Sequence, residues 1–172
     1  MTNEFIDALI CEKANEKYKE SIDLYGQFVG SWNITWNSYD KDSNLKSSVT
    51  GEWIFSYVLN GMAIQDLFIV PSREECKRNG VENGEYGTTI RIYDPEKDIW
   101  NVFYGCPGET SLLKAYKIED RIEQYCVNHT KFKQKWVFSN ITKNSFTWQN
   151  LVSYNNGKTW LKQNEALAVR NI

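Results

Sequence analysis

Hydrophobic and polar residues alternate along most of this chain from residue 31 onward. The first alternating stretch places Trp32, Ile34 and Trp36 on one side and polar residues on the other. Because successive side chains of a strand point to opposite faces, this period of two predicts strands with one buried face. The pattern predicts about ten strands, at residues 31–39, 47–59, 62–70, 86–93, 99–105, 110–118, 121–127, 132–139, 145–154 and 158–170.

Turn signals separate these strands at the intervals expected of an antiparallel meander. Asn60-Gly61 predicts a tight hairpin, because both residues tolerate positive φ, and Asn156-Gly157 predicts another before the last strand. A row of neighbouring strands leaves two exposed edges unless the sheet closes on itself. The sequence therefore predicts an all-β fold, an antiparallel up-and-down barrel.

Residues 1–28 follow a helical pattern instead. Phe5 and Leu9 recur at helical spacing, and Ile22 belongs to a second such repeat. We expect an N-terminal helical arm that docks through these three residues, either as a lid or plug on the barrel or as a dimerisation arm of a homodimer. The chain would form a single domain, 1–172, with the barrel at 29–172.

The most polar stretch of the chain, residues 72–85, joins two predicted strands. It is long for a hairpin connection. Two interpretations are open: a solvated loop, or a flap over the mouth of the barrel.

Charge and apolar runs limit the partners. With 20 Lys+Arg against 22 Asp+Glu, the net charge of −2 offers no basic excess for a phosphate backbone, so we expect no nucleic-acid partner. The longest apolar run, residues 67–71, is far below the roughly 18 residues of a membrane span. No secretory signal is recognisable after Met1, and the four cysteines are scattered, which is typical of free thiols in a reducing compartment. We expect a cytoplasmic protein.

Enzyme and metal motifs are missing from the sequence. There is no phosphate loop, no zinc-binding helix and no nucleophile elbow, and the cysteines lack metal-ligand spacing. The single histidine, His129, falls in a predicted turn, so a multi-histidine metal site and a haem site are both disfavoured. No metal and no cofactor are expected.

Aromatic residues make up 15% of the chain, and many share strand parity. A ligand cavity is commonly lined by aromatic side chains with a few polar groups, whereas a filled barrel favours packed aliphatic residues. Aromatics also fill ordinary cores, so a solid barrel stays open as an alternative. If a cavity exists, its expected walls are Trp36, Trp53, Tyr104, Trp136 and Trp148.

Some polar residues alternate with apolar ones as if they faced inward. They are Gln65, Arg91, Gln134 and Glu165. A buried carboxylate must be paired, protonated or wet, so Arg91 and Glu165 would form a structural ion pair, anchor the polar head of a ligand, or take part in acid/base chemistry. All three readings are open from the sequence.

The segment Gly30-Ser31-Trp32, with Arg170 near the end of the last strand, resembles the calycin superfamily of lipocalins and fatty-acid-binding proteins. The resemblance implies that Arg170 packs across the indole of Trp32 and closes one end of the barrel. A broader resemblance, to a bacterial family of lipocalin-like domains of unknown function, implies a fold and no reaction. It rests on residues 28–32, 59–66, 87–95 and 145–148.

The leading hypothesis is a lipocalin-like barrel that binds a small apolar or amphipathic molecule in an aromatic-lined cavity. The first alternative is an enzyme that uses the same cavity, with Glu165 or Asp66 as general acid/base and Arg91 stabilising an anion. The second is an interaction protein with a solid barrel.

Overall fold

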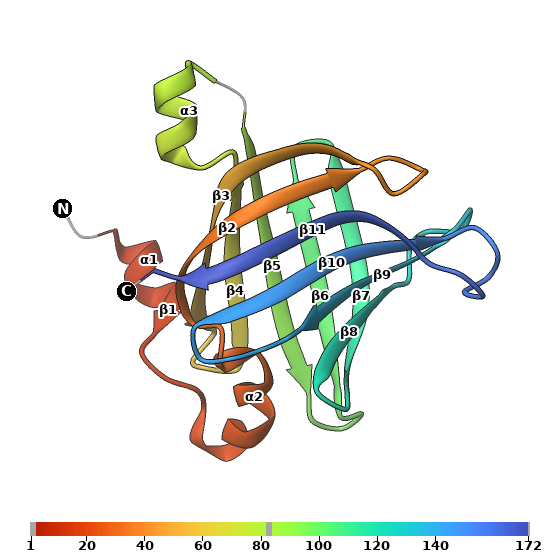
Figure 1. Cartoon of the computed structure of the whole chain (residues 1–172). Coiled ribbons are helices and arrows are strands. Elements are labelled where there is room, and N and C mark those ends of the chain that lie inside the picture. The colour runs from red at the N-terminus through yellow and green to blue at the C-terminus, as the bar shows by residue number, and fades with distance from the viewer. Residues whose placement is uncertain (1–2, 82–83, 172) are drawn as a thin grey trace.

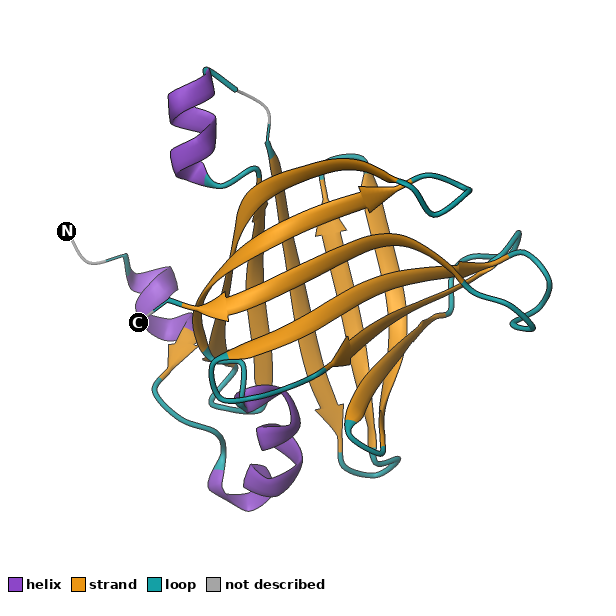
Figure 2. Ribbon diagram, in the orientation of Figure 1, coloured by secondary structure: helices purple, strands orange, loops and turns teal. Residues whose placement is uncertain are grey.

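In the computed structural model, which describes residues 3–81 and 84–171, ten antiparallel strands close into a barrel (Figure 1, Figure 2). Each strand pairs with the next, and the last pairs with the first, as the alternating pattern predicts. The strands are β2 (Gly30–Tyr39), β3 (Leu45–Val58), β4 (Ala63–Val70), β5 (Glu85–Asp94), β6 (Ile99–Cys106), β7 (Glu109–Ile118), β8 (Arg121–Cys126), β9 (Lys133–Ser139), β10 (Ser145–Ser153) and β11 (Leu161–Arg170).

The predicted hairpin between β3 and β4 is confirmed. Leu59, Asn60 and Gly61 all have positive φ, at 53°, 54° and 74°. Such backbone angles are tolerated best by Asn and Gly, which is why this dipeptide marks the turn.

The arm before β2 consists of several short elements. These are α1 (Glu4–Leu9), the two-residue strand β1 (Ile10–Cys11), a 3-10 turn (Glu16–Tyr18) and α2 (Lys19–Gly26). The last helix lies across one end of the barrel, at the bottom of Figure 1, with Ile22 and Tyr25 fully buried. The arm is therefore helical in part and plugs this end.

Docking through Phe5 was a wrong expectation. The side chain of Phe5 is 70% exposed, and no residue of α1 is buried. The helix is only six residues long, and the chain then extends so that Ile10 pairs with Val58 at the end of β3. The docking contacts come from α2 instead, and the alternative role of the arm in a homodimer stays a prediction.

The polar stretch after β4 contains a helix, α3 (Arg73–Asn79), capped by Ser72. This helix stands on the outside of the barrel wall (Figure 1), where the backbone N–H and guanidinium of Arg73 donate to Glu52 of β3 at 2.7 Å and 2.9 Å. Residues 82–83 lie outside the described part of the chain. Within the described ranges the segment does not fold over the barrel mouth as a flap.

The end beside α2 is closed by protein side chains. The guanidinium carbon of Arg170 lies 4.0 Å from the ring centroid of Trp32, the stacking that the resemblance implies. Arg170 also donates to the carbonyls of Gln27, Val29 and Lys143, each at 2.8 Å. The first and last strands are thus tied together where the barrel closes.

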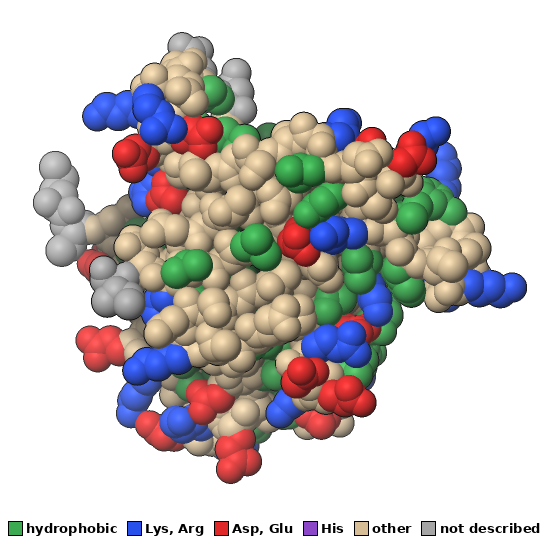
Figure 3. Space-filling model, viewed as in Figure 1, with side chains coloured by type: hydrophobic (Ala, Val, Ile, Leu, Met, Phe, Trp, Pro, Cys, Tyr) green, Lys and Arg blue, Asp and Glu red, His purple; other side chains and the backbone are tan. Residues whose placement is uncertain are grey.

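Charged side chains are unevenly placed on the outer surface. On the face in Figure 3 most of them gather around the two ends of the barrel, and few lie on the wall between. In the described ranges, no helix is both long enough and apolar enough to cross a membrane.

Candidate ligand-binding cavity

The end of the barrel opposite α2 contains a cavity of about 240 Å³. Because consecutive strands are antiparallel, β5, β7 and β9 run in the same direction and begin at this end. Glu85 and Glu109, the first residues of β5 and β7, therefore mark its rim, and Gln134 follows the first residue of β9. Residues further along these strands line its depth.

Aromatic side chains form the walls. Trp36 stacks on Trp148 with ring centroids 5.6 Å apart, and Trp148 packs against Trp136 at 5.5 Å. Tyr104 meets Trp136 edge-to-face at 5.4 Å, and Trp53 lies 5.9 Å from Trp148. These five residues are the walls predicted from strand parity, and all five line the one cavity.

Several buried polar atoms around this space have no hydrogen-bond partner in the described part of the chain. Three are the indole N–H groups of Trp53, Trp136 and Trp148, and another is the side-chain oxygen of Gln134. Each of these side chains is more than nine-tenths buried. Each of these four atoms exposes almost no surface, so they lie within the packed walls and do not open onto the cavity itself.

The floor holds a buried ion pair between Arg91 of β5 and Asp66 of β4. Both side chains are about 1% exposed, and the guanidinium also faces the rings of Tyr25, Phe55 and Phe138 at 5.0 to 5.7 Å. The expected Arg91–Glu165 pair was therefore wrong. Asp66 lies on the neighbouring strand and faces the same interior, whereas Glu165 does not.

Glu165 lies on the outer wall. Its carboxylate accepts hydrogen bonds from Tyr39, Gln149 and Lys162 at 2.8 to 3.0 Å. Burial alone would raise the pKa of Glu165, but these hydrogen bonds outweigh it and lower the pKa below its ordinary value. The carboxylate is satisfied there and does not line the cavity.

Gln65 also faces away from the interior. Its amide donates to the hydroxyl of Thr88 on the outer side of β5 at 3.0 Å. Neighbouring Asp66 and Phe68 point inward, so the inward direction expected for Gln65 was wrong. Of the nine predicted ligand-binding residues, the cavity brings together seven and leaves out Gln65 and Glu165.

A row of side-chain amides crosses the wall from β9 to β2. Gln134 donates to Asn150 at 2.9 Å, Asn150 donates to Asn164 at 3.2 Å, and Asn164 donates to Ser38 at 3.1 Å. The row leaves the oxygen of Gln134 as its free acceptor. Asn150 shares parity with Trp148, so this signal was present in the sequence.

Other cavity residues were missed by sequence reasoning. They are Phe68, Glu85, Thr89, Glu109 and Asn164. Phe68 and Thr89 share parity with Asp66 and Arg91, which gave a usable signal. The two glutamates stand at strand ends, where alternation gives no information about direction.

The rim carries a hydroxyl–carboxylate contact. The phenol of Tyr104 donates to the carboxylate of Glu85. Burial, with hydrogen bonds to Cys106 and Glu85, raises the pKa of Tyr104 far above its usual range, so the phenol keeps its proton. Among the residues that the structure describes, Glu109 accepts one long side-chain hydrogen bond, from Ser111 at 3.5 Å.

Comparisons with known proteins support the fold. No protein-family model and no curated protein matches the chain. Among solved structures, the S-type phycobiliprotein lyase CPES from Guillardia theta is similar, with a TM-score of 0.60 and 12% identity over 92% of this chain and 99% of that one. Rv2717c from M. tuberculosis is also similar, with a TM-score of 0.57 and 10% identity over 88% and 98% of the two chains. The chain is a lipocalin-like β-barrel.

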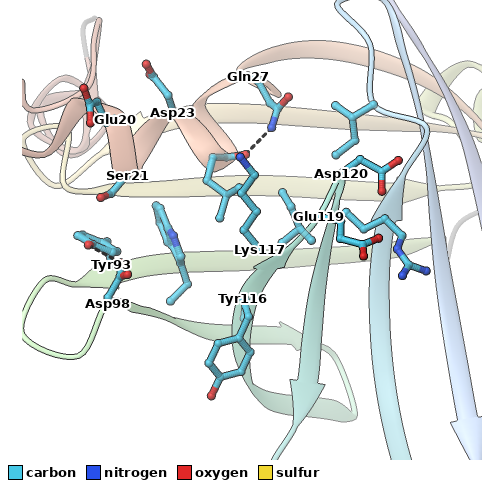
Figure 4. Close-up of a pocket in the computed structure, with 16 residues that line it drawn as sticks. Glu20, Ser21, Asp23, Gln27, Tyr93, Asp98, Tyr116, Lys117, Glu119 and Asp120 are labelled. Carbon is cyan, nitrogen blue, oxygen red and sulfur yellow. Dashed lines mark hydrogen bonds between the residues drawn. The ribbon is translucent and has the colours of Figure 1, made fainter.

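The lipocalin-like barrel has a second hollow on its outer surface, between α2 and the hairpin that joins β7 to β8 (Figure 4). At about 770 Å³ it is larger than the interior cavity, but it is a surface groove with charges of both signs. In Figure 4, Glu20 and Asp23 lie on one side of the groove and Glu119 and Asp120 on the other, without converging on one point. The interior cavity is therefore the better candidate site.

Proposed function

We propose that this lipocalin-like barrel binds one small, partly apolar molecule in the cavity at its open end. The observation that carries the proposal is the cavity itself, which aromatic side chains line together with several polar ones. Aromatic faces supply apolar contact, and a few polar atoms fix the orientation of a bound molecule. The four cysteines are free, which supports a protein of the reducing cytoplasm.

The geometry favours binding over acid/base chemistry. Of the two carboxylates considered for that chemistry, Glu165 lies on the outer wall and Asp66 is paired with Arg91. The open end is also hollow, which argues against a solid barrel that acts only through its surface.

The similar structures support the barrel fold but do not indicate which molecule the barrel binds. One is named as a lyase of phycobiliproteins, and its identity to this chain is 12%. Such a likeness shows a shared fold, while function depends on the residues of the site. The proposal therefore rests on the cavity of this chain.

The test is a titration with compact uncharged and amphipathic probes, 4-ethylphenol, 2-naphthol and octanoate. Intrinsic tryptophan fluorescence and calorimetry both report binding, because four of the seven tryptophans line the cavity. We expect saturable binding of at least one probe.

A matched pair of variants locates the bound probe. Thr89 lies inside the cavity and Thr88 is its neighbour on the outer face. Thr89→Leu fills part of the space and should weaken binding, whereas Thr88→Leu should not. The proposal fails if no probe binds, or if both folded variants bind as tightly as the original protein.

A further inference from the structure

We infer that the ligand is a compact arylalkylamine, with its ring against the tryptophans and a protonated amine at the rim. The inference rests on the proposed function and narrows it to a chemical class. Size, charge and the aromatic lining each carry part of it.

Size sets the first limit. Ligand pockets commonly measure about 300–1,000 Å³, and the cavity here, about 240 Å³, lies just below that range. At about 30 Å³ per water in the liquid, the space corresponds to roughly eight waters, or a molecule on the order of ten non-hydrogen atoms. A one-ring compound with a short side chain is enclosed completely, whereas a long acyl chain or a linked series of rings would extend out through the open end.

Charge sets the second limit. The one cation lining the cavity, Arg91, is already paired with Asp66. The remaining charged groups of the lining, Glu85 and Glu109, are carboxylates at the rim, and in the described part of the chain neither forms an ion pair with Lys or Arg. A cation at the rim gains a charge-assisted hydrogen bond to either carboxylate, and an anion there meets like charge.

The hydrogen-bonding capacity of an amine fits the same rim. An ammonium group has three N–H donors and no acceptor. Glu85 and Glu109 supply acceptors of the matching kind, and Tyr104 keeps its proton and donates to Glu85.

The inner part of the cavity suits an aromatic ring. Trp36 and Trp148 stack on each other, and Trp148 packs against Trp136. The ring of the ligand lies against the free sides of these tryptophans, below the amine.

Three phenols with the same ring test the inference by calorimetry. Tyramine carries an amine, 4-ethylphenol carries no charge, and 3-(4-hydroxyphenyl)propionate carries a carboxylate. Hydrogen bonds to charged groups contribute more than neutral ones, so we expect tyramine to bind about tenfold tighter than 4-ethylphenol. The carboxylate should bind more weakly than either.

Variants at the rim show where the amine lies. Glu109→Gln and Glu85→Gln keep the size of each side chain, and both should lower the affinity for tyramine several-fold while leaving 4-ethylphenol unchanged. Glu119→Gln, beside the outer groove at the closed end, is the matched control and should change neither.

Each outcome is decisive. If 4-ethylphenol binds and tyramine binds no more tightly, or if the rim variants leave their ratio unchanged, the arylalkylamine assignment is overturned and the cavity proposal stands. If the propionate binds as tightly as tyramine, the assignment of charge is also wrong. If none of the three binds, the arylalkylamine assignment is overturned, and the wider probe panel then decides the cavity proposal.

Discussion

Both ends of the barrel are built from aromatic side chains, yet the polar atoms of these side chains are hydrogen-bonded to different extents. At the closed end the indole N–H of Trp32 donates to the carbonyl of Phe28 at 2.7 Å, and the hydroxyl of Tyr25 donates to Gln124 at 3.0 Å. At the open end the indole N–H groups of Trp136 and Trp148 have no partner within the described ranges. Within the same ranges the closed end has one unpaired buried atom of its own, the side-chain nitrogen of Gln124, so the two ends differ in the number of such atoms, with four in the walls of the open end.

The two ends also differ in how their cations are used. Arg170 at the closed end stacks on Trp32 and donates three hydrogen bonds to backbone carbonyls. At the open end the rim carries two carboxylates and the cavity floor carries a neutralised pair. The two ends therefore share an aromatic lining and differ in whether their charged groups are paired within the fold.

The largest expected effect comes from the closed end. Trp32 is 1% exposed and packs on Phe146 at 4.7 Å. Trp32→Ala should lower the free energy of unfolding by about 3–5 kcal/mol, the usual range for a buried aromatic. Trp148→Ala should cost less, because that side chain already borders open space. Urea denaturation of both variants checks this, and equal losses would contradict the contrast between the ends.

The buried ion pair of Arg91 and Asp66 lies between the two ends, and breaking it is the next substitution by expected effect on stability. Removing only one partner leaves an uncompensated charge, so Arg91→Met should cost about 3–5 kcal/mol. The double variant Arg91→Met with Asp66→Leu should recover most of that loss, because apolar residues of similar volume replace buried pairs at little cost. A double variant as unstable as the single one would show that the pair contributes to stability in itself.

The closed barrel and its strand order were predictable because alternation repeats through ten strands and turn residues separate them. The same reasoning placed the tryptophans on the inner wall. It failed where a strand carries apolar residues on both faces. In β11 the outward residues Leu167 and Val169 are larger than the inward Ala166 and Ala168, so the wrong face looked like the core.

The small inward residues of β11 have a packing reason that its own sequence does not show. Ala166 lies opposite Trp36 and Ala168 opposite Ile34 in the neighbouring strand β2, so the large side chains of β2 fill the space that the alanines leave. Glu165 was assigned inward because it shares the face of the large residues Leu167 and Val169, which looked like the core face. The rim glutamates and the Asp66 partner of Arg91 depend likewise on which strands become neighbours, which one strand's pattern cannot show.

The smallest expected effect compares one glycine from each end. At the closed end Gly30 has a φ of +122°, and a Cβ there would lie 2.9 Å from the guanidinium of Arg170. At the open end Gly105 of β6 has nothing within 4 Å of such a Cβ. Glycine tolerates positive φ at no steric cost, whereas alanine at Gly30 would be strained and would crowd the stacked arginine.

Gly30→Ala should therefore lower the free energy of unfolding by about 1–3 kcal/mol, the usual cost of such backbone strain. Gly105→Ala should be neutral or stabilise the protein by about 0.4–1 kcal/mol, because alanine restricts the unfolded chain and fits the native strand. Thermal unfolding of the two variants gives both values. If Gly105→Ala were the more damaging change, the open end would be the tightly packed one and the assignment of the two ends would be reversed.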